Sequence, residues 1–169
     1  YNLEFSFQIT DDIGFKTSVT EQDITKTRFI NDDNEVYEYI EGEVIEGWQS
    51  GDLSGYKIAF AEEGNYDVSR AAFSGCTNID KPVFLPSSIN IIDEDVFNGC
   101  VNLPDYYTDN TCVIETFEER CFKDCSSLEE IILPISIREV KEEAFMGCFS
   151  AEDLFLSDVE IIGERAFYN

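Results

Sequence analysis

The segment Val140–Cys148, with the sequence VKEEAFMGC, contains a phenylalanine that is followed three residues later by a cysteine. The same arrangement occurs at Phe73/Cys76, Phe97/Cys100, Phe122/Cys125 and Phe145/Cys148, and Phe167 continues the series. The steps between successive phenylalanines are 24, 25, 23 and 22 residues. A period of about 20–29 residues is typical of a solenoid, in which each repeat forms one coil that buries its apolar side against its neighbours. The spacing therefore predicts a repeat solenoid, which offers a long stacked surface and favours binding over catalysis.

Further apolar columns align with the phenylalanines. Five positions before each ring stand Val68, Ile92, Phe117, Val140 and Ile162, and the residue just before each ring is small or apolar. Leu-Pro steps close the short apolar segments that end at Leu85 and Leu133, which suits strands that stop there. We expect short strands with these columns in the interior of each coil, and little helix.

Three segments resemble a known family, the BspA-like (Treponema-type) leucine-rich repeats. They are Phe73–Ile79 (FSGCTNI), Cys125–Pro134 (CSSLEEIILP) and Ile137–Phe145 (IREVKEEAF). The resemblance covers about residues 53–169 and departs from the family pattern at Asn102–Phe117, where no Leu-Pro step occurs and Cys112 intrudes. It implies a right-handed solenoid of short parallel strands, and a surface or secreted protein with a role in adhesion or protein recognition. The family shares no catalytic residues, so none are assigned here.

Residues 1–52 lack the Phe-x-x-Cys pattern. Apolar and polar residues alternate strictly over residues 1–9, which predicts a half-buried strand. Val36–Trp48 predicts either a strand pair turning at Gly42 or a poor helix. Phe60 precedes Phe73 by 13 residues, which indicates an irregular first coil that begins near Leu53. We expect a mostly β N-terminal cap over residues 1–52 and a solenoid of about five coils over residues 53–169, because a solenoid needs a cover for its apolar end.

The net charge of −25, from 36 acidic and 11 basic residues, limits the partners. Nucleic acid is held mainly by Lys and Arg contacts to phosphate, so we expect no nucleic-acid binding. Anionic membrane surfaces are disfavoured for the same reason, and no apolar run approaches the ~20 residues of a membrane span. The charge indicates either a surface that recruits basic partners or divalent cations, or simply a solvated exterior.

Four of the six cysteines share one repeat position. Coils about 4.8 Å apart would bring them within disulfide range, but stacked side chains point in parallel. We therefore expect buried free thiols, with a Cys112–Cys121 disulfide as an alternative. The spacing of the cysteines does not match a zinc site, and residues 32–35 do not complete a calcium loop. We predict no metal and no cofactor.

The chain contains no histidine, which removes Ser-His-Asp, Cys-His and metal–histidine chemistry. A mechanism with paired carboxylates stays open on composition alone. We nevertheless expect Asp93-Glu94-Asp95 and Glu142-Glu143 to face water between the core columns. We therefore predict that the protein is not an enzyme.

One file of residues is a candidate binding surface. If Val83/Leu85, Tyr106/Thr108, Ile131/Leu133 and Leu154/Leu156 point inward, strand alternation turns the residues between them outward. Those residues are Phe84, Tyr107, Ile132 and Phe155. Contiguous exposed apolar patches tend to mark interaction sites, so this file is predicted to contact a partner. The alternatives are a parity shifted by one residue, or a loop that covers the file.

We therefore expect a non-enzymatic extracellular or cell-surface repeat protein, which binds another protein of the host or of a cell surface in adhesion or interaction. The alternatives are a carbohydrate-active or calcium-dependent solenoid enzyme, and a structural spacer of a larger surface protein. The repeat stops at Phe167-Tyr168-Asn169, where a fifth repeat cysteine would come next. This indicates either further repeats or self-association through the C-terminal edge.

Overall fold

The computed structural model describes residues 27–30, 36–40, 44–45, 57–156 and 158–169. No helix occurs among these residues. The predicted strand over residues 1–9, the turn at Gly42 and the segment 32–35 lie outside them. The strands are β1 (Thr27–Ile30), β2 (Val36–Ile40), β3 (Val44–Ile45), β4 (Lys57–Ala59), β5 (Tyr66–Val68), β6 (Val83–Leu85), β7 (Ile89–Ile92), β8 (Tyr106–Thr108), β9 (Thr116–Phe117), β10 (Glu130–Ile132), β11 (Glu139–Val140), β12 (Asp153–Phe155) and β13 (Ile161–Ile162).

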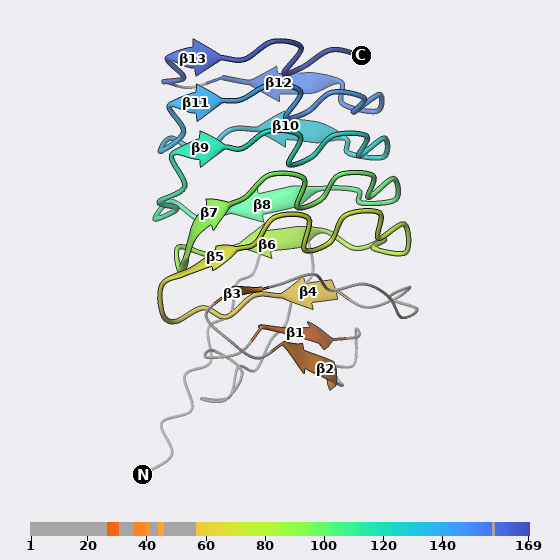
Figure 1. The fold of residues 1–169 in the computed structure, drawn as a ribbon, viewed down its shortest axis with the longest axis vertical. Helices are drawn as coiled ribbons and strands as arrows, with labels where there is room; N and C mark the ends of the chain where they lie inside the picture. The colour runs from red at the N-terminus through yellow and green to blue at the C-terminus, as the bar shows by residue number, and fades with distance from the viewer. Residues whose placement is uncertain (1–26, 31–35, 41–43, 46–56, 157) are drawn as a thin grey trace.

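The chain winds into a solenoid, and its successive coils add strands alternately to two faces (Figure 1). One face has the strand order β2-β1-β4-β6-β8 and continues as the pair β10-β12. The other face has the order β13-β11-β9-β7-β5-β3. The strands β4 to β13 pair with one another in parallel, because each coil repeats the direction of the previous one. The predicted solenoid of short parallel strands is confirmed.

The column five positions before the phenylalanines forms the inner side of the second face. Ile92 pairs with Phe117, Phe117 with Val140, and Val140 with Ile162. Ile92, Phe117 and Val140 are fully buried, whereas Ile162 in the last coil is 52% exposed.

The phenylalanine column forms a continuous stack through the core. Ring centroids lie 5.4 Å apart for Phe73 and Phe97, 5.1 Å for Phe97 and Phe122, 5.3 Å for Phe122 and Phe145, and 5.6 Å for Phe145 and Phe167. The interplanar angles are 8°, 16°, 5° and 8°, so the rings are nearly parallel. Ala72 and Ala144, beside two of the rings, are fully buried and leave room for them.

The cysteine column lies beside the ring stack. The thiols of Cys100, Cys125 and Cys148 each donate a hydrogen bond to the carbonyl oxygen of the phenylalanine of the preceding coil, over 3.1, 3.2 and 3.3 Å. All six cysteines are buried free thiols, as expected for the column. Cys112 and Cys121 do not form the alternative disulfide.

Two columns of left-handed backbone turn the chain in each coil. Two residues after the ring, Gly75, Gly99 and Gly147 have φ between 72° and 79°, and Asp124 takes this position with a φ of 57°. Gly147 cannot be replaced freely, because an added Cβ would contact the Asp124 carboxylate and its Cα. The second column stands two residues before each ring and contains no glycine; its members are Ala71, Asp95, Arg120, Glu143 and Arg165.

The N-terminal strands extend the first face. β1 pairs antiparallel with both β2 and β4. The segment Val36–Trp48 therefore provides strands, as one of its two interpretations predicted. In the part of the chain that the structure describes, however, β2 and β3 do not pair with each other: β2 pairs with β1, and β3 pairs in parallel with β5.

Candidate functional site

The predicted apolar file lies on the outer side of the first face. Phe84 and Tyr107 are register partners in β6 and β8, and Ile132 and Phe155 are register partners in β10 and β12. Of the flanking residues predicted to point inward, five are at most 4% exposed: Val83, Leu85, Tyr106, Ile131 and Leu133. Thr108 is half-buried, and Leu154 and Leu156 are 43% and 46% exposed. Ile132 is 45% exposed and Phe155 is 55% exposed, while Phe84 and Tyr107 are partly exposed. We call Phe84, Tyr107, Ile132 and Phe155 the apolar stripe.

The stripe runs over two sheets, whereas the sequence predicted one. No strand pairing joins β8 and β10 among the described residues, so the parallel ladder is interrupted there. The coil at this point is the one whose repeat departs from the family pattern. On this face two hydrogen bonds join it to the next coil: the Glu129 amide donates to the carbonyl oxygen of Pro104 over 3.1 Å, and the Tyr106 hydroxyl donates to the carbonyl oxygen of Ile132 over 2.9 Å.

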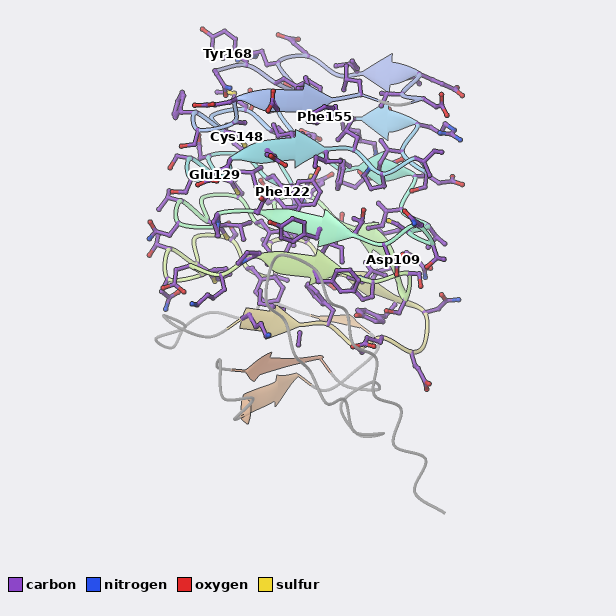
Figure 2. The ribbon with its side chains drawn as sticks, turned by 180° about the vertical axis from the view of Figure 1, so that it is seen from behind. Asp109, Phe122, Glu129, Cys148, Phe155 and Tyr168 are labelled. Atoms are coloured by element: carbon purple, nitrogen blue, oxygen red, sulfur yellow. The ribbon has the colours of Figure 1, made fainter. Side chains whose placement is uncertain are left out.

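A row of carboxylates lies beside the stripe, at or just before the start of the same strands. Glu130 and Asp153 open β10 and β12 and are register partners. Each precedes a stripe residue by two positions, so it points to the same side of the sheet. Figure 2 shows Glu129 at the beginning of β10, and Phe155 at the far end of the neighbouring strand β12. We define the acidic row as Asp105, Glu129, Glu130, Glu152 and Asp153.

Asp105 joins the acidic row to the stripe. Its Oδ2 accepts a hydrogen bond from the Tyr107 hydroxyl over 3.0 Å, and its Oδ1 accepts one from the Tyr106 amide over 3.1 Å. Partial burial raises the pKa of the Asp105 carboxyl, and the charges of Glu130 and Glu129 raise it further. Burial, followed by the charge of Asp105, raises the pKa of Tyr107 to about 12.

The acidic row is not neutralised within the structure. In the described part of the chain, none of its five carboxylates forms an ion pair. This row was not predicted from the sequence. Aligning the coils on the stripe would have found it, because Asp105, Glu130 and Asp153 all stand two residues before a stripe residue.

The basic side chains instead pair with carboxylates near the ring column. Arg120 binds Asp95, and Lys123 binds Glu143 over 2.8 Å. The side chains of Asp95 and Glu143 are only 16% and 13% exposed. Our expectation that these acidic clusters simply face water is therefore wrong for Asp95 and Glu143, because each forms an ion pair with a basic side chain of a neighbouring coil.

The thiols do not form a nucleophilic site. Burial raises the pKa values of Cys76, Cys100, Cys112, Cys121, Cys125 and Cys148, for Cys148 to about 12. They are therefore protonated at neutral pH, and a protonated thiol is a poor nucleophile. Over the described residues, no group of three or more cysteine, aspartate and glutamate side chains has an arrangement that could hold a metal ion. The same residues include no helix with the length and apolar character of a membrane span.

The last coil exposes residues of the inward columns. Leu154, Leu156 and Ile162 are 43%, 46% and 52% exposed, although their equivalents Ile131, Leu133 and Val140 are buried. Phe167 stacks on Phe145, whereas Phe122 has a ring on each side.

Two solved structures are similar to this chain. A leucine-rich repeat protein from Bacteroides ovatus is 15% identical with a TM-score of 0.31, and the match covers 75% of this chain and 55% of that protein. The Treponema pallidum leucine-rich repeat protein TpLRR is 16% identical with a TM-score of 0.40, and the match covers 86% of each chain. The chain thus spans little more than half of the length of the Bacteroides protein. No curated protein matches it.

A model of one protein family matches most of this chain. The BspA type leucine-rich repeat region matches residues 56–169 in six copies. These residues include the whole ring column, the cysteine column and the strands from β4 onward. The chain belongs to the BspA-type leucine-rich-repeat family.

Proposed function

We propose that this chain is a non-enzymatic repeat protein that binds another protein through the apolar stripe. The observation that carries the proposal is the alternation of burial at β10, where Ile132 lies between the buried Ile131 and Leu133, and the register pairing of Ile132 with Phe155 in β12. Ile132 and Phe155 project outward and are 45% and 55% exposed, in a chain of net charge −25. Large apolar side chains that line up across a charged surface typically serve as anchors for a partner.

The family supports this proposal at the level of its class, because leucine-rich-repeat proteins commonly mediate interactions between proteins. The solenoid also suits the role, since equivalent positions of successive coils line up into one continuous surface. Adhesion and an extracellular or cell-surface location are the finer parts of the proposal. Labelling of intact source cells with an antibody against the chain, with and without permeabilisation, tests the location.

The test of the stripe uses a double variant, Ile132→Ser with Phe155→Ser. Phe149→Ser is the matched control, because Phe149 is 71% exposed and lies outside the stripe. Both proteins should unfold at nearly the same urea concentration as the unaltered chain. In capture experiments from cell-surface extracts, the double variant should lose the proteins that the unaltered chain and the control retain. Equal capture by all three proteins would contradict the proposal, and so would loss of folding in the double variant.

We also propose that the chain self-associates through its C-terminal edge. Leu154, Leu156 and Ile162 expose apolar surface that the preceding coil buries at Ile131, Leu133 and Val140, and a second copy would cover it. Sedimentation over a range of protein concentrations tests this part. A mass that rises with concentration, and that stays monomeric in a Leu154→Lys variant, is the expected result. A monomer at all concentrations contradicts self-association and leaves the stripe proposal unaffected.

A further inference from the structure

We infer that the protein segment held by the apolar stripe is cationic, and that it places lysine or arginine side chains on the acidic row while its apolar side chains lie on the stripe. This inference rests on the proposed function and names the chemistry of the partner.

The stripe and the row form one composite surface. Glu130 and Asp153 lie two residues before Ile132 and Phe155 on the same strands, which is about 7 Å along a strand. Glu130 and Asp153 are register partners, as are Ile132 and Phe155, and their two strands lie about 4.8 Å apart. On an amphipathic helix, side chains three or four residues apart have a similar spacing of about 5–6 Å. A partner helix can therefore present one strip of apolar and one strip of basic side chains to this surface.

The distribution of charge makes a basic partner the fitting one. Arg70, Arg120, Lys123, Lys141 and Arg165 form ion pairs with carboxylates that lie outside the acidic row. Within the described residues, the row keeps five carboxylates without such a pair. An acidic partner segment would bring like charges together next to the stripe, which is unfavourable. A basic segment would be attracted, and its orientation on the stripe would be fixed.

The state of Asp105 supports the same conclusion. Its pKa is raised by partial burial and by Glu130 and Glu129, so the folded chain holds this carboxylate in an unfavourable environment. A cation on the row would relieve the repulsion among these three groups. Because Tyr107 donates its hydroxyl hydrogen bond to Asp105, a cation bound there would also lie next to a ring of the stripe.

The experiment uses synthetic amphipathic helical peptides as probes. The first carries leucine along one strip and lysine along the adjoining strip, the second has glutamate in place of every lysine, and the third has serine in place of every leucine. The row variant combines Glu129→Gln, Glu130→Gln, Glu152→Gln and Asp153→Asn. Its matched control neutralises four exposed acids outside both features, by Glu63→Gln, Glu115→Gln, Asp158→Asn and Glu160→Gln. Both variants have a net charge of −25 + 4 = −21, so net charge alone cannot distinguish them.

Binding is measured by fluorescence anisotropy at low and high salt. We expect the leucine–lysine peptide to bind, the row variant to bind it about tenfold more weakly, and the control variant to change affinity by about twofold or less. The salt dependence of binding should be smaller for the row variant. Equal weakening in both variants, absence of binding by the leucine–lysine peptide, or equally tight binding of the glutamate peptide would overturn the inference.

The stripe variant Ile132→Ser with Phe155→Ser separates this inference from the function on which it rests. If this variant binds the leucine–lysine peptide as tightly as the unaltered chain, the stripe is not the docking surface and the proposed function fails. If the stripe variant loses binding while the row variant keeps it, the stripe stands and only the cationic partner is ruled out. The serine peptide completes the test, because it should bind more weakly than the leucine–lysine peptide to the unaltered chain.

Discussion

Arg120 forms two hydrogen bonds with Asp95, the residue at the same repeat position one coil earlier: Nε donates to Oδ1 over 2.8 Å and Nη2 to Oδ2 over 3.1 Å. Both residues have left-handed backbone, with φ values of 56° and 60°. Such a conformation costs a residue with a Cβ about 1–2 kcal/mol. From Asp95 onward the column alternates acidic and basic through Arg120, Glu143 and Arg165. We call these four residues the charge ladder. The attraction between its opposite charges offsets part of the backbone strain.

A double-mutant cycle over Asp95→Ala and Arg120→Ala should show that the two side chains are coupled. The Arg120 side chain is 27% exposed and that of Asp95 is 16% exposed, so solvent screens the pair only in part. We expect a coupling free energy of about 1 kcal/mol from urea unfolding, which decreases at high salt. Additive effects of the two substitutions would show that the contact contributes nothing to stability.

The same pair predicts how stability depends on pH. The hydrogen bond from Arg120 is the main reason why the pKa of Asp95 lies below its ordinary value. A carboxyl whose pKa is lower in the folded state stabilises the fold above its unfolded pKa, and this stabilisation is lost as the pH falls through the folded pKa. When the pH is lowered from 5, the Arg120→Ala variant should therefore lose less thermal stability than the unaltered chain does. Identical acid dependence of the melting temperature in both proteins would contradict this explanation.

The ring stack predicts a difference between its middle and its end. Phe122 is fully buried, with Phe97 and Phe145 at 5.1 and 5.3 Å and with Tyr106 at 4.9 Å. Among the described residues, Phe167 stacks on Phe145 only, and it is partly exposed. Phe122→Ala should cost about 3–5 kcal/mol, and Phe167→Ala clearly less.

Urea unfolding followed by fluorescence and by circular dichroism tests this prediction. Because coils contact only their neighbours, Phe122→Ala should also make the unfolding transition seen by fluorescence differ in midpoint from the one seen by circular dichroism. In Phe167→Ala the two transitions should coincide. Equal destabilisation by the two substitutions would mean that the stack does not hold the coils together.

The thiol column predicts slow alkylation in the folded protein. Cys125 is fully buried, donates to the carbonyl oxygen of Phe97, and has a pKa raised by burial. Cys76 and Cys112 are 7% and 8% exposed and should react first with iodoacetamide at pH 8. Peptide mass spectrometry after timed alkylation gives the order, and unfolding in urea should make all six thiols equally reactive. Rapid modification of Cys125 in the folded chain would contradict the prediction.

The repeat period was sufficient to predict the solenoid and the ring stack. Each depends on apolar residues that recur at one interval, and such a pattern can be recognised in the sequence. The charge ladder could not be predicted in this way. Its left-handed positions carry Asp95, Arg120, Glu143 and Arg165 without a glycine to mark the turn, and their pairing depends on the rotation of one coil relative to the next. The division into a cap over residues 1–52 and a solenoid over 53–169 stays a proposal, which the antiparallel pairing of β1 with β4 supports.

The candidate site shows the same contrast. Strand alternation correctly predicted that Ile132 points outward between the buried Ile131 and Leu133, because that depends only on parity, whereas all three residues of β12 are exposed. The interruption between β8 and β10 is bridged by long-range contacts of Pro104 and Tyr106, which no local pattern reveals.

The acidic row predicts a substitution that does not destabilise the fold. The pKa of Asp105 is raised, so its charged form is unfavourable in the folded state at neutral pH, and this cost is relieved as the pH falls through the folded pKa. Asp105→Asn keeps an acceptor for the Tyr106 amide and removes the charge that faces Glu130 and Glu129. Its free energy of unfolding at pH 7 should equal or exceed that of the unaltered chain, whereas Asp95→Asn, which weakens a hydrogen-bonded ion pair, should lower it. If urea unfolding shows equal losses for the two variants, Asp105 is a structural residue. If only Asp95→Asn loses stability while Asp105→Asn binds the leucine–lysine peptide more weakly, the carboxylate of Asp105 contributes to binding and not to folding.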